Sequence, residues 1–360
     1  MNKKQAFSTP FTLVYENKYP ILGIGPGFYK NYIDAKTASP DKWVKKDEQT
    51  IIEQSKKQIF TIKNFKKTET LTKDVTIENI QLLSQTYKTT EIEFDSGNKT
   101  KIINDEITGI NNYSFDLNKL KIIDNLKIPK IIDKTVNDID LKAQEGILNI
   151  YNKLDNVYKI QQLLSVGLLG EKQNRIFVPT KWSITAVDDI IGKKNIENIK
   201  INQEINKPEL YIFQFYKNKF YIIILPYKEW AFEMIENQGD KYLDIDYEIG
   251  TPRKQYATSV GGGYYAARIE ISKALEKRKK IGKVLVLRDI LPEYKSPGVW
   301  VIREAIKEAM NKKPLIFEDL ESIKKYLDNV ENIRHKSEWW FNKSNILKDI
   351  KNQKRIFEYY

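Results

Sequence analysis

Residues 211–226 read Tyr-Ile-Phe-Gln-Phe-Tyr-Lys-Asn-Lys-Phe-Tyr-Ile-Ile-Ile-Leu-Pro. Two segments that are almost wholly apolar or aromatic flank Lys217-Asn218-Lys219, and this pattern predicts a β-hairpin with its turn near those three residues. Strands that are apolar on both faces lie in sheets covered on both sides. We therefore expect this hairpin in the core of a sheet.

The sequence after this hairpin alternates between helical and buried-strand patterns. Gly261-Gly262-Gly263 precedes a predicted helix over residues 264–280, a buried strand follows at 284–287, and a turn at Ser296-Pro297-Gly298 opens a helix to Met310. Two further helices are predicted at 318–328 and 339–350. Such alternation favours an α/β or α+β fold: a mixed sheet with surrounding helices, a helical C-terminal end and a flexible tail.

The N-terminal third gives weaker patterns. Short strands are predicted at 11–15 and 59–62, and residues 90–102 read as a hairpin around an Asp-Ser-Gly-Asn turn. The segment Gly-Ile-Gly-Pro-Gly at 23–27 lacks the spacing of a nucleotide-binding loop, so we interpret it as a tight turn. The expected organisation is a mixed region at 1–130, a helix and hairpin region at 131–245, an α/β region at 246–350 and a tail at 351–360.

Composition excludes several kinds of site. The 360 residues include no cysteine and one histidine, His335, which excludes disulfides, thiolate-bound zinc and multi-histidine metal sites. No apolar run is long enough for a membrane span, and the first residues lack the apolar core of a signal peptide. We therefore expect a cytoplasmic protein without a membrane partner.

The charge balance favours a polyanionic partner. The formal net charge is +12 and the pI about 9.2, as is common in proteins that contact nucleic acid. Only eight of the 60 basic residues are arginine, and none precedes Arg175. Lysine cannot replace the planar fork of a guanidinium, so the retained arginines are candidates for phosphate or carboxylate recognition, with chance retention as the alternative.

The last eight residues form the most specific motif. Residues 353–360 read Gln-Lys-Arg-Ile-Phe-Glu-Tyr-Tyr, which matches the sliding-clamp motif Gln-x-x-aliphatic-x-x-aromatic-aromatic. In one tight helical turn, Ile356, Tyr359 and Tyr360 form a three-pronged apolar plug, and Gln353 supplies a polar anchor. The alternative is a helix end whose aromatic side chains pack into the core.

Three internal groups could carry chemistry. Gly261, Gly262 and Gly263 leave backbone amides free at a helix start, where Arg268 would reinforce a phosphate seat; a flexible glycine turn is the alternative. Lys181 and Trp182 could combine phosphate contact with base stacking, although tryptophan is more often a core residue. Asp188 and Asp189 could bind Mg²⁺ for phosphodiester cleavage, with Asp289, Glu304 and Glu233 as partners, or they could be structural.

Several blocks also carry a family resemblance. Residues 178–189 (VPTKWSITAVDD), 261–268 (GGGYYAAR) and 284–303, with Arg288 and Arg303 near its ends, resemble the archaeal Nre family of DNA repair proteins. The resemblance runs through most of the chain and includes a C-terminal clamp-interacting motif. It implies a role in DNA damage repair and binding to the archaeal clamp, the PCNA homologue, but no established reaction. Some members carry an N-terminal cysteine zinc motif, which this chain lacks, so no zinc site is expected.

Together these observations predict a DNA repair factor recruited to the PCNA clamp through its C-terminal motif, with a basic body that contacts DNA. One alternative is a metal-dependent nuclease or another phosphate-handling enzyme, which alone would need Mg²⁺. A non-enzymatic protein scaffold is the other. Phosphate-binding candidates are Lys181, Gly261, Gly262, Gly263, Arg268, Arg288 and Arg303.

Overall fold

The computed structural model describes residues 3–105, 110–239, 242–331 and 333–357. The chain forms two compact units, one running to Ile191 together with Ser296–Gly298, and the other comprising Gly192–Lys295 and the residues from Val299. The helix α7, Thr180–Ile199, continues across this division. The boundaries expected at residues 130, 245 and 350 stay predictions.

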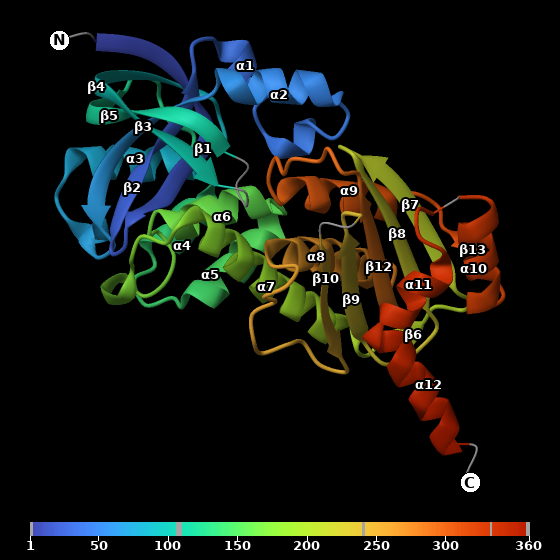
Figure 1. Ribbon diagram of the computed structural model, residues 1–360. Helices are drawn as coiled ribbons and strands as arrows, with labels where there is room; N and C mark the ends of the chain where they lie inside the picture. The colour runs from blue at the N-terminus through green and yellow to red at the C-terminus, as the bar shows by residue number, and fades with distance from the viewer. Residues whose placement is uncertain (1–2, 106–109, 240–241, 332, 358–360) are drawn as a thin grey trace. The chain divides into compact units, whose positions relative to one another are not determined.

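The first unit is built on a closed five-stranded barrel in the order β1-β2-β3-β5-β4 (Figure 1). Strand β1 pairs antiparallel with both β2 and β4, which closes the barrel, and β3 runs parallel to β5. The strands are β1 Lys3–Lys18, β2 Ile21–Tyr29, β3 Ile59–Lys66, β4 Thr90–Asp105 and β5 Ile110–Ile122. The strands expected at 11–15 and 59–62 lie in β1 and β3.

Two expectations about turns in this region are wrong. Residues 95–98 do not form a hairpin turn, because they lie within β4. The pairing register between β4 and β5 shifts at several points in this stretch, as it does at β-bulges. The glycines at 23–27 lie within β2. A Cβ atom on Gly25 would lie 1.6 Å from the Thr61 carbonyl oxygen, so the absent side chain permits close contact between barrel strands.

Helices pack around the barrel, and a buried lysine connects two of them. Lys159 on α6 donates hydrogen bonds to the carbonyl oxygens of Ser84 and Thr86, at 2.8 and 2.7 Å, and to Gln162 Oε1 at 2.7 Å. These bonds tie α6 to the end of α3. The helices of this unit are α1 Tyr32–Lys36, α2 Glu48–Lys57, α3 Val75–Gln85, α4 Lys130–Asn137, α5 Ala143–Leu154 and α6 Val157–Ser165. Short 3₁₀ helices occupy Pro40–Lys42, Glu69–Leu71 and Lys172–Asn174.

The second unit contains a six-stranded mixed sheet in the order β10-β9-β12-β8-β7-β13. The hairpin predicted from residues 211–226 is confirmed, since β7 and β8 pair antiparallel and turn at Tyr216 and Lys217. Strand β12 pairs antiparallel with β8 and parallel with β9. The strands are β7 Glu209–Phe215, β8 Asn218–Leu225, β9 Ala231–Asn237, β10 Leu243–Ile249, β12 Lys283–Ile290 and β13 Leu315–Ile316. Strands β6 Gln203–Glu204 and β11 Lys280–Ile281 form a separate parallel pair.

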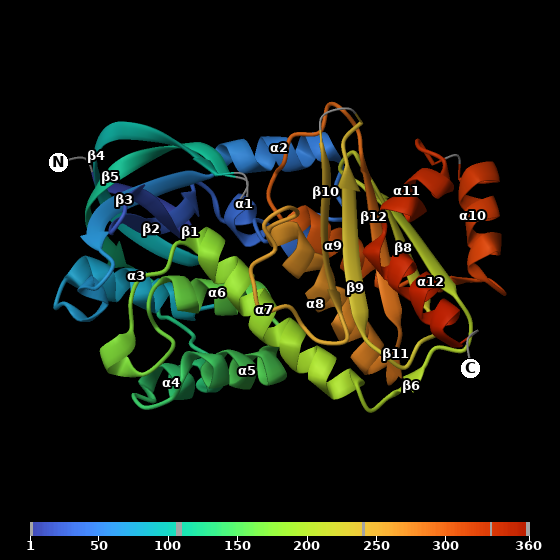
Figure 2. The ribbon, with the colours of Figure 1, turned by 60° about the horizontal axis from the view of Figure 1, so that its bottom comes forward.

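Helices cover both faces of this sheet (Figure 2). On one face, α8 and α9 bury residues such as Phe232, Met234 and Val286; on the other, α10 to α12 bury residues such as Ile235 and Leu287. The helices are α8 Gly262–Lys277, α9 Trp300–Met310, α10 Leu320–Asn329, α11 Ser337–Lys343 and α12 Asn345–Phe357. The expected mixed sheet with surrounding helices and a helical C-terminal end is confirmed.

Within the described residues, no helix combines the length and the apolar character that crossing a bilayer requires.

Gly25→Ala should destabilise the first unit, because its methyl group would overlap a backbone carbonyl that cannot rotate away. We expect a loss of about 3 kcal/mol or more in the free energy of unfolding, at the upper end of overpacking effects. The matched control is Gly97→Ala in β4, where the nearest atom, Asp116 Cβ, would lie 3.1 Å away. Urea denaturation measures both, and equal losses would contradict the close-approach argument.

The stability of the first unit should depend on pH through Lys159, because burial lowers the pKa of its ammonium from 10.5 to about 7. Between these values the unfolded chain binds a proton that the folded chain has released, so stability should rise as pH rises from about 7 towards 10.5. Lys159→Met should remove this rise, measured as denaturation midpoints at several pH values. Lys194→Met, on an exposed part of α7, should leave the rise intact.

Candidate functional site

A buried carboxylate anchors the helix that carries the first residues of the predicted clamp motif. Glu233 on β9 has no exposed surface and lies at the start of α12, where the backbone amides are uncovered. It accepts hydrogen bonds from the amides of Asn345 at 2.7 Å and Ile346 at 3.2 Å, and also from the Ser344 hydroxyl. An anion at a helix N-terminus satisfies these donors and interacts favourably with the helix dipole. The Glu233 carboxylate therefore has a structural role, which is to hold the start of α12.

A second contact fixes the middle of α12. Lys283 on β12 is buried, and its Nζ lies 2.9 Å from Asp349 Oδ2. The same Asp349 oxygen accepts a hydrogen bond from Gln353 Nε2 at 3.1 Å. The first residue of the motif is therefore linked through Asp349 to the sheet. Leu347 and Ile350 pack on the apolar cluster of the same face.

The other motif residues lie at the limit of the described chain. The backbone of Ile356 belongs to α12, which ends at Phe357. Tyr359 and Tyr360 lie outside the described residues. The three-pronged apolar plug stays a prediction, but the helix expected to begin it is present and starts from a fixed anchor.

Acidic side chains surround the glycine loop. Gly261 precedes α8 with a positive φ of 64°, and Gly262 and Gly263 form its first turn. A Cβ atom on Gly263 would lie 3.3 Å from Glu236 Oε1, so a carboxylate of the protein itself lies near this helix start. Asp246 Oδ2 accepts from the amide of Val260 at 2.7 Å. Amides before the helix are thus already engaged by a carboxylate, and phosphate binding here stays a prediction.

The arginines of the family-like blocks are buried in the second unit. Arg268 has no exposed surface, and its Nη1 donates to Glu248 Oε2 at 2.9 Å. Arg288 donates from Nη1 to Glu236 Oε1 at 2.7 Å. Burial raises the pKa of Glu236, although the Arg288 guanidinium opposes this shift. Arg303 on α9 is 1% exposed.

Arg268 and Arg288 thus pair with carboxylates of the protein itself. Their proposed phosphate contacts stay predictions. A phosphate would have to enter this buried set and compete with Glu236 or Glu248.

The carboxylates proposed for catalysis occupy different surroundings. Asp188 is fully buried on the part of α7 that belongs to the first unit, and its Oδ1 accepts from Gln161 Nε2 at 3.0 Å. Its neighbour Asp189 is half-buried. Their proposed partners Asp289, Glu304 and Glu233 belong to the second unit. Within the described ranges, no three histidine, aspartate or glutamate side chains gather as metal ligands would.

Lys181 and Trp182 lie in the first turn of α7. Lys181 forms an ion pair with Glu16 on β1. Trp182 is 46% exposed, so it is not the core residue that tryptophan more often becomes. Its ring lies 5.7 Å from that of Tyr19, centroid to centroid. Tyr19 was not among the predicted site residues, because nothing in its local sequence pairs it with a residue 163 positions later.

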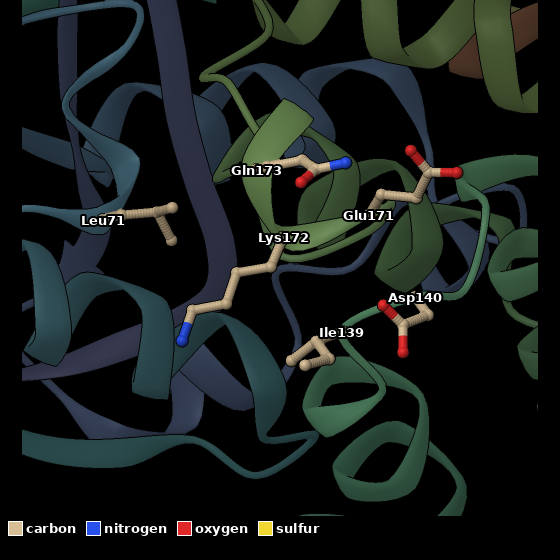
Figure 3. A pocket seen from close by; sticks show the side chains of 6 residues that line it. All are labelled: Leu71, Ile139, Asp140, Glu171, Lys172 and Gln173. Atoms are coloured by element: carbon tan, nitrogen blue, oxygen red, sulfur yellow. The ribbon is translucent and has the colours of Figure 1, made fainter.

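A pocket of about 530 Å³ in the first unit was also not predicted (Figure 3). Lys172 extends towards the side where Leu71 lies, whereas Asp140 and Glu171 lie on the opposite side. Arg175 shapes this region, donating to the carbonyl oxygens of Val136, Asp138 and Gly170. These contacts explain why the first arginine of the chain is retained: a guanidinium fork can reach three carbonyls at once.

Residues 1–241 match the model of the archaeal Nre N-terminal region, and residues 248–359 match that of the archaeal Nre C-terminal region. DNA repair protein NreA of Archaeoglobus fulgidus is 29% identical over 324 residues, covering 87% of this chain and 82% of that protein. DNA repair protein NreA of Haloferax volcanii is 34% identical over 200 residues, covering 52% of this chain and 47% of that protein.

DNA repair protein NreB of Archaeoglobus fulgidus is 34% identical over 230 residues, covering 61% of this chain and 57% of that protein. No solved structure matches the chain. Because the two family models together span nearly all of the sequence, the chain belongs to the archaeal Nre family.

Proposed function

We propose that this chain is a DNA repair factor that the PCNA sliding clamp recruits through Gln353, Ile356, Tyr359 and Tyr360, while its basic body contacts DNA. The observation that carries the proposal is a clamp-type motif at the end of a helix that the body holds in place through Glu233 and Lys283. The names of the three relatives support the repair role.

The anchored helix suits a recruiting function. A peptide of modest affinity concentrates the attached body near the clamp. The effective concentration of the body there depends on the length and stiffness of the segment that connects it to the peptide. Here the first residues of the motif, 353–357, are themselves part of α12, so no linker separates them from the anchored start of that helix. The body is therefore held close to any clamp that binds the motif, which limits the DNA that it can reach.

A basic body is suited to DNA that the clamp encircles. The net charge of +12 attracts phosphates at long range, and recruitment raises the local DNA concentration, so a weak intrinsic DNA affinity is sufficient. This role requires no reaction. It places the protein in the cytoplasm, associated with DNA.

The proposed clamp contact predicts a specific loss. Tyr359→Ala combined with Tyr360→Ala should weaken binding to purified archaeal PCNA about 100-fold or more, because two aromatic anchors of a small interface are removed. Isothermal titration calorimetry measures the affinity. Phe357→Ala is the matched control, since it removes an aromatic residue at a position that the motif leaves free. Equal losses in both variants would contradict the motif-based interface.

The role of Asp188 distinguishes a recruited DNA-binding factor from a nuclease. We expect no turnover of branched or damaged DNA by the wild-type protein with Mg²⁺ or Mn²⁺, measured on labelled substrates in denaturing gels. Asp188→Ala should instead lower the free energy of unfolding by about 1–3 kcal/mol, because Gln161 loses a buried acceptor. Metal-dependent cleavage that disappears in Asp188→Ala, with the fold intact, would favour the nuclease.

A further inference from the structure

An exposed pair of aromatic rings lies at one end of the barrel in the first unit. Tyr19, in the turn between β1 and β2, is 50% exposed, and Trp182, in the first turn of α7, is 46% exposed. Their ring planes meet at 49° with the centroids 5.7 Å apart. Two large rings that stay in water side by side present a stacking surface that the core does not use.

One lysine contacts this pair, and others lie on the strands that adjoin it. Lys67 donates from Nζ to the Tyr19 hydroxyl at 2.8 Å and lies 5.0 Å from the centre of that ring. The strand register pairs Lys18 with Ile21, and Ile21 with Lys66, so two exposed lysines flank an exposed isoleucine in one row. Lys181 neutralises Glu16, the nearby acidic residue on β1. Glu69 also lies here and accepts from the Lys66 amide at 2.5 Å. Lys18, Lys66 and Lys67 together outnumber this carboxylate, so the rim keeps a net positive charge.

The backbone that presents these side chains is fixed. The Lys67 amide donates to the Pro20 carbonyl at 3.0 Å, and the Lys67 carbonyl accepts from the Phe177 amide at 2.8 Å. The Thr180 hydroxyl oxygen accepts from the Val14 amide at 2.9 Å, which ties the start of α7 to β1. A ligand would thus meet preorganised rings and lose little affinity to ordering them.

The barrel itself indicates the class of ligand. Its order β1-β2-β3-β5-β4, with β3 parallel to β5 and α3 between β3 and β4, is the strand order of the OB-fold. Barrels of this kind bind oligonucleotides on the face of strands 2 and 3 and at the loop between strands 1 and 2. Here the β1–β2 turn carries Tyr19, and the end of β3 carries Lys66.

We propose that Tyr19, Trp182, Lys66 and Lys67 form a binding platform for single-stranded DNA. Unpaired bases stack on the two rings, and the adjacent phosphates meet the lysines. Stacking requires a free base face, so the platform selects single strands over duplexes, and it tolerates any sequence because every base has such a face. This inference rests on the proposed function and names the DNA that the body contacts.

The test is fluorescence anisotropy with the full chain and a labelled 20-nucleotide oligothymidine. Tyr19→Ala combined with Trp182→Ala should weaken binding at least about fivefold and up to about 100-fold, the range for losing a base–aromatic stack. Trp182→Phe, which keeps a stacking face, should recover most of the affinity. Lys66→Ala combined with Lys67→Ala should reduce the dependence of log K on log salt by about 0.7 for each phosphate that a lysine no longer neutralises.

Tyr113→Ala is the matched control. Tyr113 lies on β5 of the same barrel, and its side chain is 51% exposed with Lys99 Nζ 3.4 Å from the ring centre. The next residue, Ser114, pairs with Phe60 at the start of β3. The Tyr113→Ala variant should bind oligothymidine with the affinity of the wild type. Binding of the Tyr19/Trp182 variant within twofold of the wild type would overturn the platform. So would a duplex, an RNA or an acidic peptide that binds more tightly than the oligothymidine and loses affinity in the same variant.

Failure of this inference and failure of the proposed function give different results. The Tyr19/Trp182 variant should still bind PCNA, since the motif is untouched. If the wild type binds DNA but the variant loses nothing, only the platform is refuted. If the wild type binds neither single-stranded nor duplex DNA at low salt, DNA contact by the body fails as well, and the platform fails with it.

Discussion

Two buried carboxylates in strand β9 constrain the second unit. Glu233 and Glu236 are both buried, and alternation along the strand places them on opposite faces of the sheet, with Ile235 and Met234 respectively. A buried carboxylate must be paired or hydrogen-bonded, because its desolvation is otherwise very costly. Glu233 is satisfied by the start of α12, and Glu236 by Arg288 with α8 close by. Glu233 thus holds the helix α12 on one face, and Glu236 joins β9 to β12 on the other, close to the start of α8.

The sequence predicted the elements whose information is local. The hairpin of β7 and β8 follows from apolar runs around a polar turn, and the alternation after it indicated the mixed sheet. The barrel could not be predicted in the same way, because its closure depends on the pairing of β1 with β4 and of β3 with β5, far apart in sequence. Gly25 shows why local signals misled: glycine and proline usually indicate a turn, but here glycine allows one strand to approach another.

The same distinction separates the predicted and unpredicted parts of the sites. The proposed clamp motif is contiguous and could be read directly, whereas Glu233, which anchors α12, precedes the motif by 120 residues. Only one residue of the aromatic pair was predicted from the sequence. Trp182 was a candidate, but the contact with its partner Tyr19 forms only when the chain folds. The chemistry of arginine made these residues candidates for phosphate or carboxylate recognition. Only the structure shows that Arg268 and Arg288 bind carboxylates of the protein itself.

The division of work between arginine and lysine bears on how this chain would meet DNA. Guanidinium groups are used internally where a fork must satisfy several acceptors, as Arg175 does with three carbonyls and Arg278 with both oxygens of Glu209. The exposed positive charge near the aromatic pair is lysine, a flexible point charge that contacts phosphate without the bidentate geometry that reads guanine. DNA contact through such a surface depends on the backbone and on base stacking, and therefore on strand state and salt more than on sequence. Tolerance of sequence is what a repair factor located by a clamp requires, because the clamp supplies the position and lesions occur at any sequence.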